Sequence, residues 1–381
     1  MLKTRNLFAL LAVAAIFISA CSKTKAPGSW AVIDTGTGDA FYNVNFVDEN
    51  RGWLNGHTDR SYTPTPEELA NANANKNSRT AKPKEKPEDP LKANQGFEVL
   101  QTTDGGKSWR QIPDQFKYKI RSVWFVDPQN GWALSIDRDI LRTTDGGASW
   151  ALQRKASMTK LKLFSGRGER IVDVPDQIDQ IYFVDAGHGW AWGGGRKDSY
   201  SQQPGVLLST VDGGQNWNEI PYPFEHDISA IFFLDAARAW ASTKDGFYRT
   251  ADGGLNWAKI QTKLPEELFY SIFFLDENNG WVVGRSGRMA KTEDGGSTWT
   301  RITRDMIRAE FVMRDVHFTD HDHGWAVGEG GEILYTDDGG EHWASMRSSF
   351  PAQFTDVFFV NAKAGWIGGL NGAFVRFEST D

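Results

Sequence analysis

The chain contains a single cysteine, Cys21, among 381 residues, so an intramolecular disulfide is excluded. No apolar run long enough to span a membrane follows residue 20. The chain also lacks an excess of basic residues: its formal net charge is -7 and its pI is about 5.6, which gives no signature of nucleic-acid binding. It contains no phosphate-binding glycine loop, no Cys-x-x-Cys pair and no Ser-His-Asp arrangement, and the sequence therefore offers little support for an enzyme.

The sequence does contain a strand pattern that is repeated seven times. Each copy is an apolar segment that ends in Phe-x-Asp or Phe-x-Asn and is followed by a tryptophan, usually as Gly-Trp. The paired residues are Phe46 and Trp53, Phe125 and Trp132, Phe183 and Trp190, Phe233 and Trp240, Phe274 and Trp281, Phe318 and Trp325, and Phe359 and Trp366. The last three intervals between the phenylalanines are 41, 44 and 41 residues, a length that fits one four-stranded propeller blade.

A second motif, Thr-x-Asp-Gly-Gly-x-x-Trp, follows the first in six copies. An aspartate can accept backbone N–H bonds within its own turn, and glycine accepts positive φ at little steric cost, so the motif predicts a turn between two strands. We call this turn the Asp-box. Its tryptophan and that of each Gly-Trp pair are predicted to pack between blades, which leaves few tryptophans for a sugar platform. The Asp-box aspartates are Asp104, Asp145, Asp212, Asp252, Asp294 and Asp338.

The seventh copy of the Asp-box is divided between the two ends of the chain. The chain ends in Ser379-Thr380-Asp381, which is the front half of the motif, and Gly28-Ser29-Trp30 matches its back half. We therefore predict an all-β fold, a seven-bladed β-propeller whose N- and C-terminal strands share the last blade. Such a closed ring leaves no open sheet edge, and Asp381 is the seventh structural aspartate.

The N-terminus has the features of a lipoprotein signal peptide over residues 1–20. A charged start precedes an apolar run, and the run ends in Ile18-Ser19-Ala20-Cys21, which resembles the bacterial lipoprotein cleavage box. Cys21 is then the acylated first residue, 21–29 is a lipidated tether and 30–381 is the propeller. The predicted location is the cell envelope on the periplasmic side, where Ser22 favours the outer membrane. The alternative is an ordinary signal peptide with an incidental cysteine.

Three stretches depart from the repeat. The first, 56–97, is rich in Asn, Lys, Pro and Glu and is predicted to be disordered or partly helical. The second, 152–178, is predicted to be a basic loop, and the third lies between Gly193 and Gly205. If strands A to D run from the centre of a blade to its rim, these stretches are B-to-C or D-to-A connections. Strand alternation places all of them on one face, the insertion face, opposite the Asp-boxes.

Arginine is also predicted to collect on the insertion face. Its guanidinium group suits bidentate recognition of carboxylates or phosphates, which makes these residues candidates for partner binding. The alternative is a solvated rim in which each arginine pairs with a nearby acid. The candidates are Arg121, Arg138, Arg285, Arg288, Arg301, Arg304, Arg308, Arg314 and Arg347.

The run from His317 to His323, HFTDHDH, contains residue types that bind zinc. His321 and His323 fall in a predicted A-to-B turn where other blades carry ordinary polar residues, which favours a role without metal. We predict no metal site and no cofactor. The expected partners are a protein and a membrane surface, and the ring is expected to be monomeric.

The lipoprotein signal, the seven Phe-x-Asp segments and the Asp-boxes together resemble the photosystem II stability/assembly factor family. The resemblance covers Trp30 to Asp381 and implies a propeller without catalysis that binds a membrane-protein assembly intermediate on an arginine-rich face. Arg285, Arg288 and Arg314 correspond to that face by their position in the blade. The long insertion at 56–97 departs from the compact pattern of the family.

Asp-box turns also occur in sialidases and related glycoside hydrolases, and such an enzyme is the competing interpretation. A sialidase needs an arginine triad for the substrate carboxylate and a tyrosine nucleophile, and Tyr42 and Tyr270 lie on the predicted insertion face. Sialidases resemble six-bladed rings with an Arg-Ile-Pro signature, whereas this sequence has seven copies and no such signature. A secreted carbohydrate-binding propeller is a further alternative.

Overall fold

The computed structural model describes residues 27–37, 40–57, 97–112, 119–165, 168–194, 205–262, 264, 268–302, 311–346 and 352–379. Within these ranges the regular structure consists of strands and two short 3-10 turns. No helix in them has the length and apolar character needed to cross a membrane. The predictions for Cys21, Asp381, the signal peptide and nearly all of 56–97 lie outside the described residues, as do Arg304, Arg308 and Arg347.

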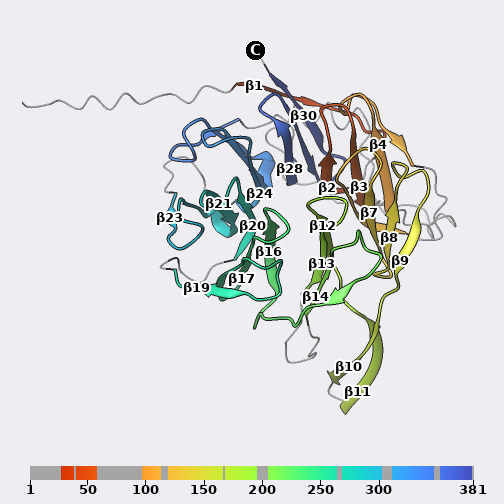
Figure 1. The fold of residues 1–381 in the computed structure, drawn as a ribbon. Helices are drawn as coiled ribbons and strands as arrows, with labels where there is room; N and C mark the ends of the chain where they lie inside the picture. Colours follow the sequence, from red (N-terminus) through yellow and green to blue (C-terminus); the bar gives the residue numbers. More distant parts are fainter. Residues whose placement is uncertain are drawn as a thin grey trace, which may run out of the picture.

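Seven four-stranded antiparallel sheets are arranged around a central axis, which confirms the seven-bladed propeller (Figure 1). The strands of the first four blades, from centre to rim, are β2 (Ala40–Phe46), β3 (Gly52–His57), β4 (Phe97–Thr102) and β5 (Arg110–Gln111); β6 (Ile120–Phe125), β7 (Gly131–Ser135), β8 (Ile140–Thr143) and β9 (Ala151–Arg154); β12 (Gln180–Phe183), β13 (Gly189–Gly193), β14 (Val206–Thr210) and β15 (Asn218–Glu219); and β16 (Ile228–Phe233), β17 (Ala239–Thr243), β18 (Gly246–Thr250) and β19 (Ala258–Ile260).

The remaining three blades follow the same order. Their strands are β20 (Phe269–Phe274), β21 (Gly280–Gly284), β22 (Met289–Thr292) and β23 (Thr300–Arg301); β24 (Met313–Phe318), β25 (Gly324–Gly328), β26 (Ile333–Thr336) and β27 (Ala344–Ser345); and β28 (Phe354–Asn361), β29 (Ala364–Gly369), β30 (Phe374–Ser379) and β1 (Gly28–Val32). The 3-10 turns η1 (Arg285–Gly287) and η2 (Glu329–Gly331) connect the second and third strands of blades 5 and 6.

The two ends of the chain close the ring in blade 7. Strand β1 is its outermost strand and pairs antiparallel with β30, with Gly28 opposite Ser379 and Val32 opposite Val375. The predicted sharing of the last blade is therefore confirmed. The strand begins at Gly28, slightly before the predicted start of the propeller at Trp30.

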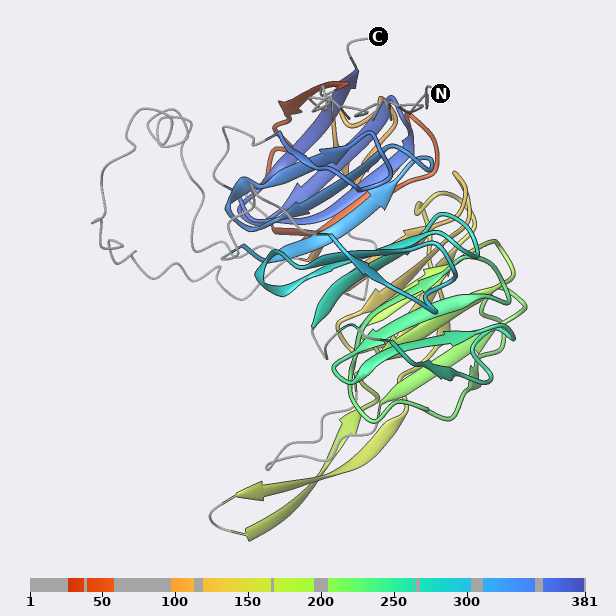
Figure 2. The ribbon, with the colours of Figure 1, turned by 90° about the vertical axis from the view of Figure 1, so that its left-hand side faces the viewer.

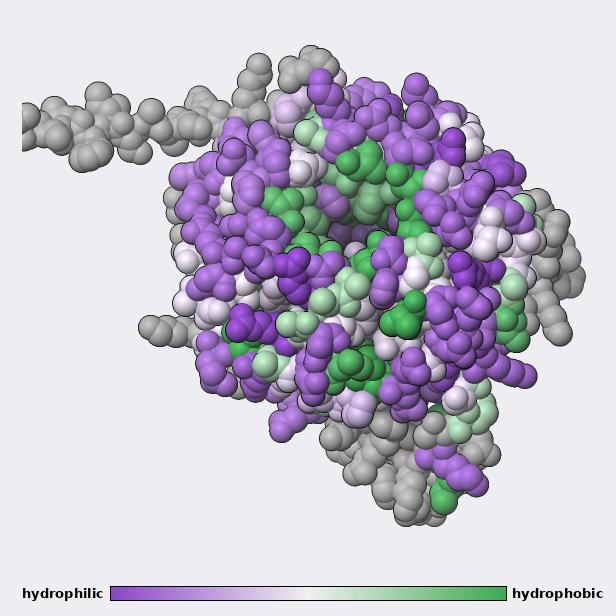
Figure 3. All heavy atoms as spheres, in the orientation of Figure 1, coloured by the Kyte–Doolittle hydropathy of each residue, from purple (hydrophilic) through white to green (hydrophobic). Residues whose placement is uncertain are grey.

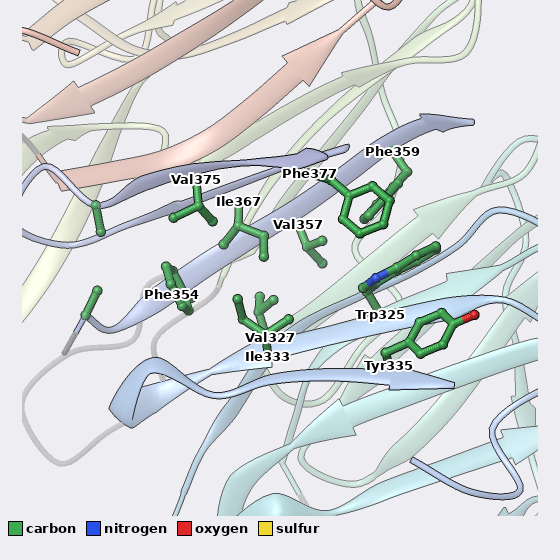
Figure 4. Close-up of a cluster of buried hydrophobic side chains, with 12 residues drawn as sticks. Trp325, Val327, Ile333, Tyr335, Phe354, Val357, Phe359, Ile367, Val375 and Phe377 are labelled. Atoms are coloured by element: carbon green, nitrogen blue, oxygen red, sulfur yellow. The ribbon is translucent and has the colours of Figure 1, made fainter. Parts of the chain in front are cut away.

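One aromatic contact holds every pair of neighbouring blades together. The tryptophan at the second position of the second strand stacks on the phenylalanine of the next blade, and the ring centroids lie between 3.4 and 3.9 Å apart. Figure 4 shows this contact between blades 6 and 7, where Trp325 and Phe359 meet within a cluster of buried side chains. The seven stacked pairs are Trp53–Phe125, Trp132–Phe183, Trp190–Phe233, Trp240–Phe274, Trp281–Phe318, Trp325–Phe359 and Trp366–Phe46.

The Asp-box tryptophan packs edge-on against the same phenylalanine. Trp109 meets Phe46 with ring centroids 6.0 Å apart and an interplanar angle of 85°. In blade 7, which takes this residue from the N-terminus, Trp30 meets Phe359 at 5.8 Å and 85°. The predicted packing role of both tryptophan sets is confirmed, and Trp30 takes the place of an Asp-box tryptophan.

The Asp-box turn has the predicted geometry. Asp104 Oδ1 accepts the backbone N–H of Ser108 at 2.9 Å, and the Thr102 hydroxyl accepts the N–H of Gly106 at 2.9 Å. Gly105 and Gly106 have φ values of +74° and +83°, which explains the glycine pair. Partial burial raises the pKa of Asp104, but hydrogen bonds from Ser108 and Thr102 outweigh it and lower this pKa to about 2. The carboxylate therefore keeps its charge, and its place in the turn, in any physiological buffer.

The segment 152–178, predicted to be a basic loop, forms regular structure. It contains the end of β9 and a two-stranded antiparallel hairpin of β10 (Met158–Ser165) and β11 (Gly168–Pro175). Its sequence alternates Lys with Leu and then contains Ile171-Val172, a composition of high strand propensity. The prediction of a loop was based on the basic residues and did not take this pattern into account. The hairpin follows β9, which runs toward the insertion face, and Figure 2 shows it projecting from the disc.

Replacement of Trp30 tests the closure of the ring. We expect Trp30→Ala to lower the free energy of unfolding by about 3 kcal/mol, because it removes a packed aromatic side chain from the seam between β1 and β30. Urea denaturation followed by tryptophan fluorescence measures this change. Leu255→Ala is the control, since Leu255 is 63% exposed and its truncation should change stability by less than about 0.5 kcal/mol. Equal stability of Trp30→Ala and the wild type would contradict the shared blade.

Candidate functional site

The innermost strands share an irregularity that directs side chains toward the central channel. In six of them the pairing with the second strand slips four residues before the phenylalanine of the repeat. A β-bulge of this kind leaves one residue out of the ladder and turns its side chain in a new direction. The residues at this position form a polar set, the mouth ring, at the insertion-face end of the channel: Tyr42, Arg121, Asp179, Ser229, Tyr270, Arg314 and Thr355. Six of them line the cavity, and Arg121 lies beside the lining residue Asp179.

The channel below the mouth ring becomes less polar along its length. Its cavity has a volume of about 770 Å³. One step inward, the wall carries polar side chains such as Asn43 and Ser271, and near the Asp-boxes it carries aliphatic ones such as Val126 and Leu234. Figure 3 shows apolar residues gathered around the central opening. Between these layers lies a belt of rings, formed by Trp124, Tyr182, Phe232, Phe273, His317 and Phe358.

Two groups of arginines lie at the mouth ring, and each is paired with an acid. Arg121 and Arg138 both contact Asp179, at 3.0 and 2.6 Å. Arg314 contacts Glu329 at 2.6 Å and lies 5.1 Å from the centre of the Tyr270 ring. These pairs match the alternative considered above, in which the arginines are held by nearby acids.

Net positive charge nevertheless remains at Arg121 and Arg138. Burial and repulsion by Arg138 lower the pKa of Arg121, and the attraction of Asp179 only partly offsets them. Two guanidinium groups therefore share one carboxylate. A second carboxylate brought to this position would relieve their repulsion.

The other described arginines lie further along the insertion face. Arg285 is exposed in η1, and its guanidinium group has no ion pair with any residue that the structure describes. Arg288 and Arg301 are also exposed. The structure thus brings Arg121, Arg138 and Arg314 to the channel mouth and leaves Arg285, Arg288 and Arg301 beside it.

A carboxyl pair lies just inside the mouth, in the wall formed by blades 6, 7 and 1. Asp315 accepts the Ser271 hydroxyl at 2.6 Å and the Val357 N–H at 2.9 Å. Asp356 accepts the Val44 N–H at 2.5 Å and is hydrogen-bonded to Asp315. Desolvation and the negative charge of Asp315 raise the pKa of Asp356 well above its usual range, so the pair shares one proton. The carboxyl groups bind the backbones of neighbouring blades, which makes them part of the seam.

The histidines of HFTDHDH point to different partners. His317 belongs to the belt of rings, 4.9 Å from Phe273, and burial lowers its pKa to about 4, which keeps it neutral. His321 contacts Asp276 at 3.4 Å, and His323 contacts Asp320 at 2.8 Å. Among the described residues no three His, Cys, Asp or Glu side chains are placed to hold a metal ion.

Together these features define a class: a seven-bladed Asp-box propeller with a polar, arginine-bearing mouth on one face of its channel. The chain belongs to the family described as photosynthesis system II assembly factor YCF48, whose sequence profile matches residues 105–263, 215–307, 254–352 and 303–378.

Individual relatives support the same assignment. The photosystem II assembly lipoprotein Ycf48 of Synechococcus sp. (strain CC9902) is 27% identical over 155 residues, a match that spans 39% of this chain and 44% of that relative. A solved structure described as YCF48 bound to D1 peptide superposes with a TM-score of 0.65 at 17% identity, and covers 93% of this chain and 96% of its own. The structure of YCF48 from Cyanidioschyzon merolae superposes with a TM-score of 0.63 at 19% identity, and the match covers 92% of this chain and 99% of that one.

The propeller fold is shared more widely. A streptogramin B lyase structure superposes with a TM-score of 0.53 at 11% identity, and covers 92% of this chain and 97% of its own. At this identity the likeness shows the fold alone.

Sequence reasoning identified the arginines of the mouth ring but missed Asp179, Ser229 and Thr355. These residues are unremarkable one at a time. Alignment of the seven copies on their phenylalanines reveals them, because a polar residue stands four positions earlier in every blade. These residues are therefore recognised by their position within the repeat and not by their residue type.

The shared proton predicts how stability depends on pH. The folded protein keeps a proton on Asp356 that the unfolded chain releases near pH 4, so the free energy of unfolding should fall as pH rises from about 4 through the raised pKa. Asparagine has the shape of the protonated carboxyl and does not titrate. We expect Asp356→Asn to match the wild type near pH 4 and to exceed it in stability at pH 8, as measured by urea denaturation across this range.

The alanine variant provides the control. Asp356→Ala leaves the Val44 N–H without its acceptor, which should cost about 1–3 kcal/mol at every pH. The same pH slope in wild type and Asp356→Asn would contradict a shared proton.

Proposed function

We propose that this protein is a non-catalytic, envelope-anchored propeller that binds an assembly intermediate of a membrane-protein complex at the mouth ring. The observation that carries the proposal is the bulge repeated in six blades, which turns one polar side chain of each toward the same opening. Bulges are common where a side chain must be re-aimed at a binding site. Membership of the YCF48 family supports an assembly role, and the solved relative described as bound to D1 peptide supports a peptide segment as the ligand.

The chemistry of the mouth favours a segment that carries carboxylates. The Arg121–Arg138 pair shares a single acid, and Arg314 can exchange Glu329 for a carboxylate of the partner. Tyr42, which is 57% exposed, and Tyr270 add hydrogen-bonding groups with large contact surfaces. Below them, the belt of rings offers an apolar space for one side chain of the segment.

The described residues favour binding over catalysis. The oxygens of Asp315 and Asp356 serve the blade seams, and the described arginines at the mouth are paired with acids in separate groups rather than converging as a triad. A sialidase-like mechanism needs three guanidinium groups on one substrate carboxylate. We therefore place the function in recognition of a protein.

The anchor completes the proposal. We infer that Cys21 is acylated and holds the ring on a membrane of the cell envelope, or on the lumenal side of the thylakoid in a photosynthetic host. The Ile18-Ser19-Ala20-Cys21 sequence and the description of the Synechococcus relative as a lipoprotein support this step.

Charge reversal at the mouth tests partner binding. We expect the double variant Arg285→Glu/Arg314→Glu to weaken partner capture by at least about 2 kcal/mol, roughly 30-fold in Kd, while the melting temperature changes little because both side chains lie outside the blade cores. A pull-down from solubilised host membranes with quantitative mass spectrometry measures the effect. Lys107→Glu, exposed on an Asp-box, is the matched control. Capture lost in the control and kept in the double variant would place the binding surface on the opposite face.

Removal of the thiol tests the anchor. We expect Cys21→Ser to leave the membrane fraction or to remain unprocessed, since acyl chains supply the attachment. Membrane fractionation followed by mass measurement of the N-terminus checks the result. Identical soluble pools for the variant and the wild type would rule out acylation.

A further inference from the structure

The direction of β1 determines which side of the ring lies near the anchor. In each blade the third strand runs from the insertion face to the Asp-box, so β30, the third strand of blade 7, ends at Ser379 on the Asp-box face. Strand β1 is antiparallel to it, and Gly28 pairs with Ser379. The chain therefore enters the propeller on the Asp-box face, at the outer rim of blade 7, and runs toward the insertion face. Figure 2 shows β1 running in this direction, toward the side from which the hairpin projects.

The tether is short compared with the ring. Six residues, 22–27, separate Cys21 from Gly28, and even a fully extended chain spans only about 25 Å between those two residues. Strand β1 has five residues and is about 17 Å long. If the insertion face were turned toward the membrane, the tether would have to run back along most of β1 before it reached the lipid.

The hairpin increases the distance that the tether would have to span if the insertion face were turned toward the membrane. Strands β10 and β11 have eight residues each, about 26 Å, and project from the insertion face. The hairpin leans outward as it projects (Figure 2), so with that face against the membrane it would hold the disc away from the bilayer by part of its own length. Even half of its length, added to the length of β1, comes to about 30 Å, which exceeds the reach of the tether. The opposite orientation places no such demand on the tether.

We propose that the Asp-box face of blades 7 and 1 faces the anchoring membrane and that the mouth ring opens away from it. This inference rests on the proposed acylation of Cys21 and deepens it. The partner must then bring a segment that stands clear of the anchoring bilayer, such as a terminus or loop outside the membrane. The Asp-box face then becomes the surface that meets lipid head groups.

Two exposed positions at opposite ends of one strand provide a matched test. Gln353 precedes β28 on the insertion face, and Lys363 follows it on the Asp-box face, so both belong to blade 7. Because acylation consumes the chain's single cysteine, Gln353→Cys and Lys363→Cys each introduce the sole free thiol of the acylated protein. Each variant is purified as the acylated full chain, labelled with bimane and reconstituted into phosphatidylcholine vesicles that contain a head-group nitroxide lipid.

We expect nitroxide quenching of the Lys363→Cys label to exceed that of the Gln353→Cys label at least threefold. Equal quenching, or stronger quenching at Gln353→Cys, would overturn the orientation. A twelve-residue Gly-Ser insertion after Pro27 is expected to abolish the difference, because the longer tether can reach around the rim. A difference that survives the insertion would show that the tether does not set the orientation.

The labelling itself separates this inference from the function on which it rests. One bimane per chain shows that Cys21 is acylated, and two show that it is free, which would overturn both the anchor and the orientation. An inverted quenching pattern with one label per chain would overturn the orientation alone. Partner capture by the same two variants, measured in parallel, reports on the mouth ring independently of either result.

Discussion

The ring depends on one contact: the stacking of a tryptophan from each blade on the phenylalanine of the next. The stacked distance is nearly constant at all seven interfaces, which makes the blades equivalent where they meet. The phenylalanine also explains the glycine that precedes six of the seven tryptophans, because a Cβ at Gly52 would lie 2.5 Å from the Phe46 ring; only blade 4 has an alanine, Ala239, at this position. Five of the seven indoles further donate to an Asp-box carbonyl of the next blade, as Trp132 does to Gly213 at 3.0 Å. Aromatic packing thereby positions the turns as well as the sheets.

At the inner edge of the ring, the backbone groups of the innermost strands need hydrogen-bond partners, and the candidate site lies along these strands. The innermost strands present backbone groups that no further strand can pair. Side chains from neighbouring blades bind several of them: Asn45 accepts the Phe125 N–H at 2.7 Å, and the Trp124 indole donates to the Phe183 carbonyl at 2.8 Å. Where a bulge interrupts the strand, the side chain turns toward the mouth, and among these residues Thr355 also donates its hydroxyl to the Phe41 carbonyl of blade 1. The bulge thus gives each of these innermost strands one position that faces the channel mouth, while side chains at other positions hold neighbouring blades together.

The fold was predictable because its determinants are side chains that recur at fixed spacing. Phe46 and its six equivalents, the Asp-box glycines and the divided motif at Trp30 each carry a local physical meaning that one sequence reveals. The mouth was less predictable, because a bulge at Tyr42 or Thr355 depends on strand register, which no single copy of the repeat reveals; only the alignment of all seven copies shows the recurrent polar position. The acid partners of Arg121 and Arg314 were likewise hidden, since Asp179 lies just before β12 in the next blade and Glu329 lies in η2. In the 152–178 segment, basic residues drew attention to charge and obscured a strand pattern.

Closure by β1 also has a consequence for the order of folding. Contacts across the seam join residues very far apart in sequence, such as Thr355 and Phe41, which are 314 positions apart. Loop closure over such a distance is slow, and the last blade lacks its partner strand until the end of the chain has been made. For an exported chain, the ring can therefore be completed only after translocation. Until β30 has been made, β1 has no partner strand, and the sheet of blade 7 that closes the ring stays incomplete.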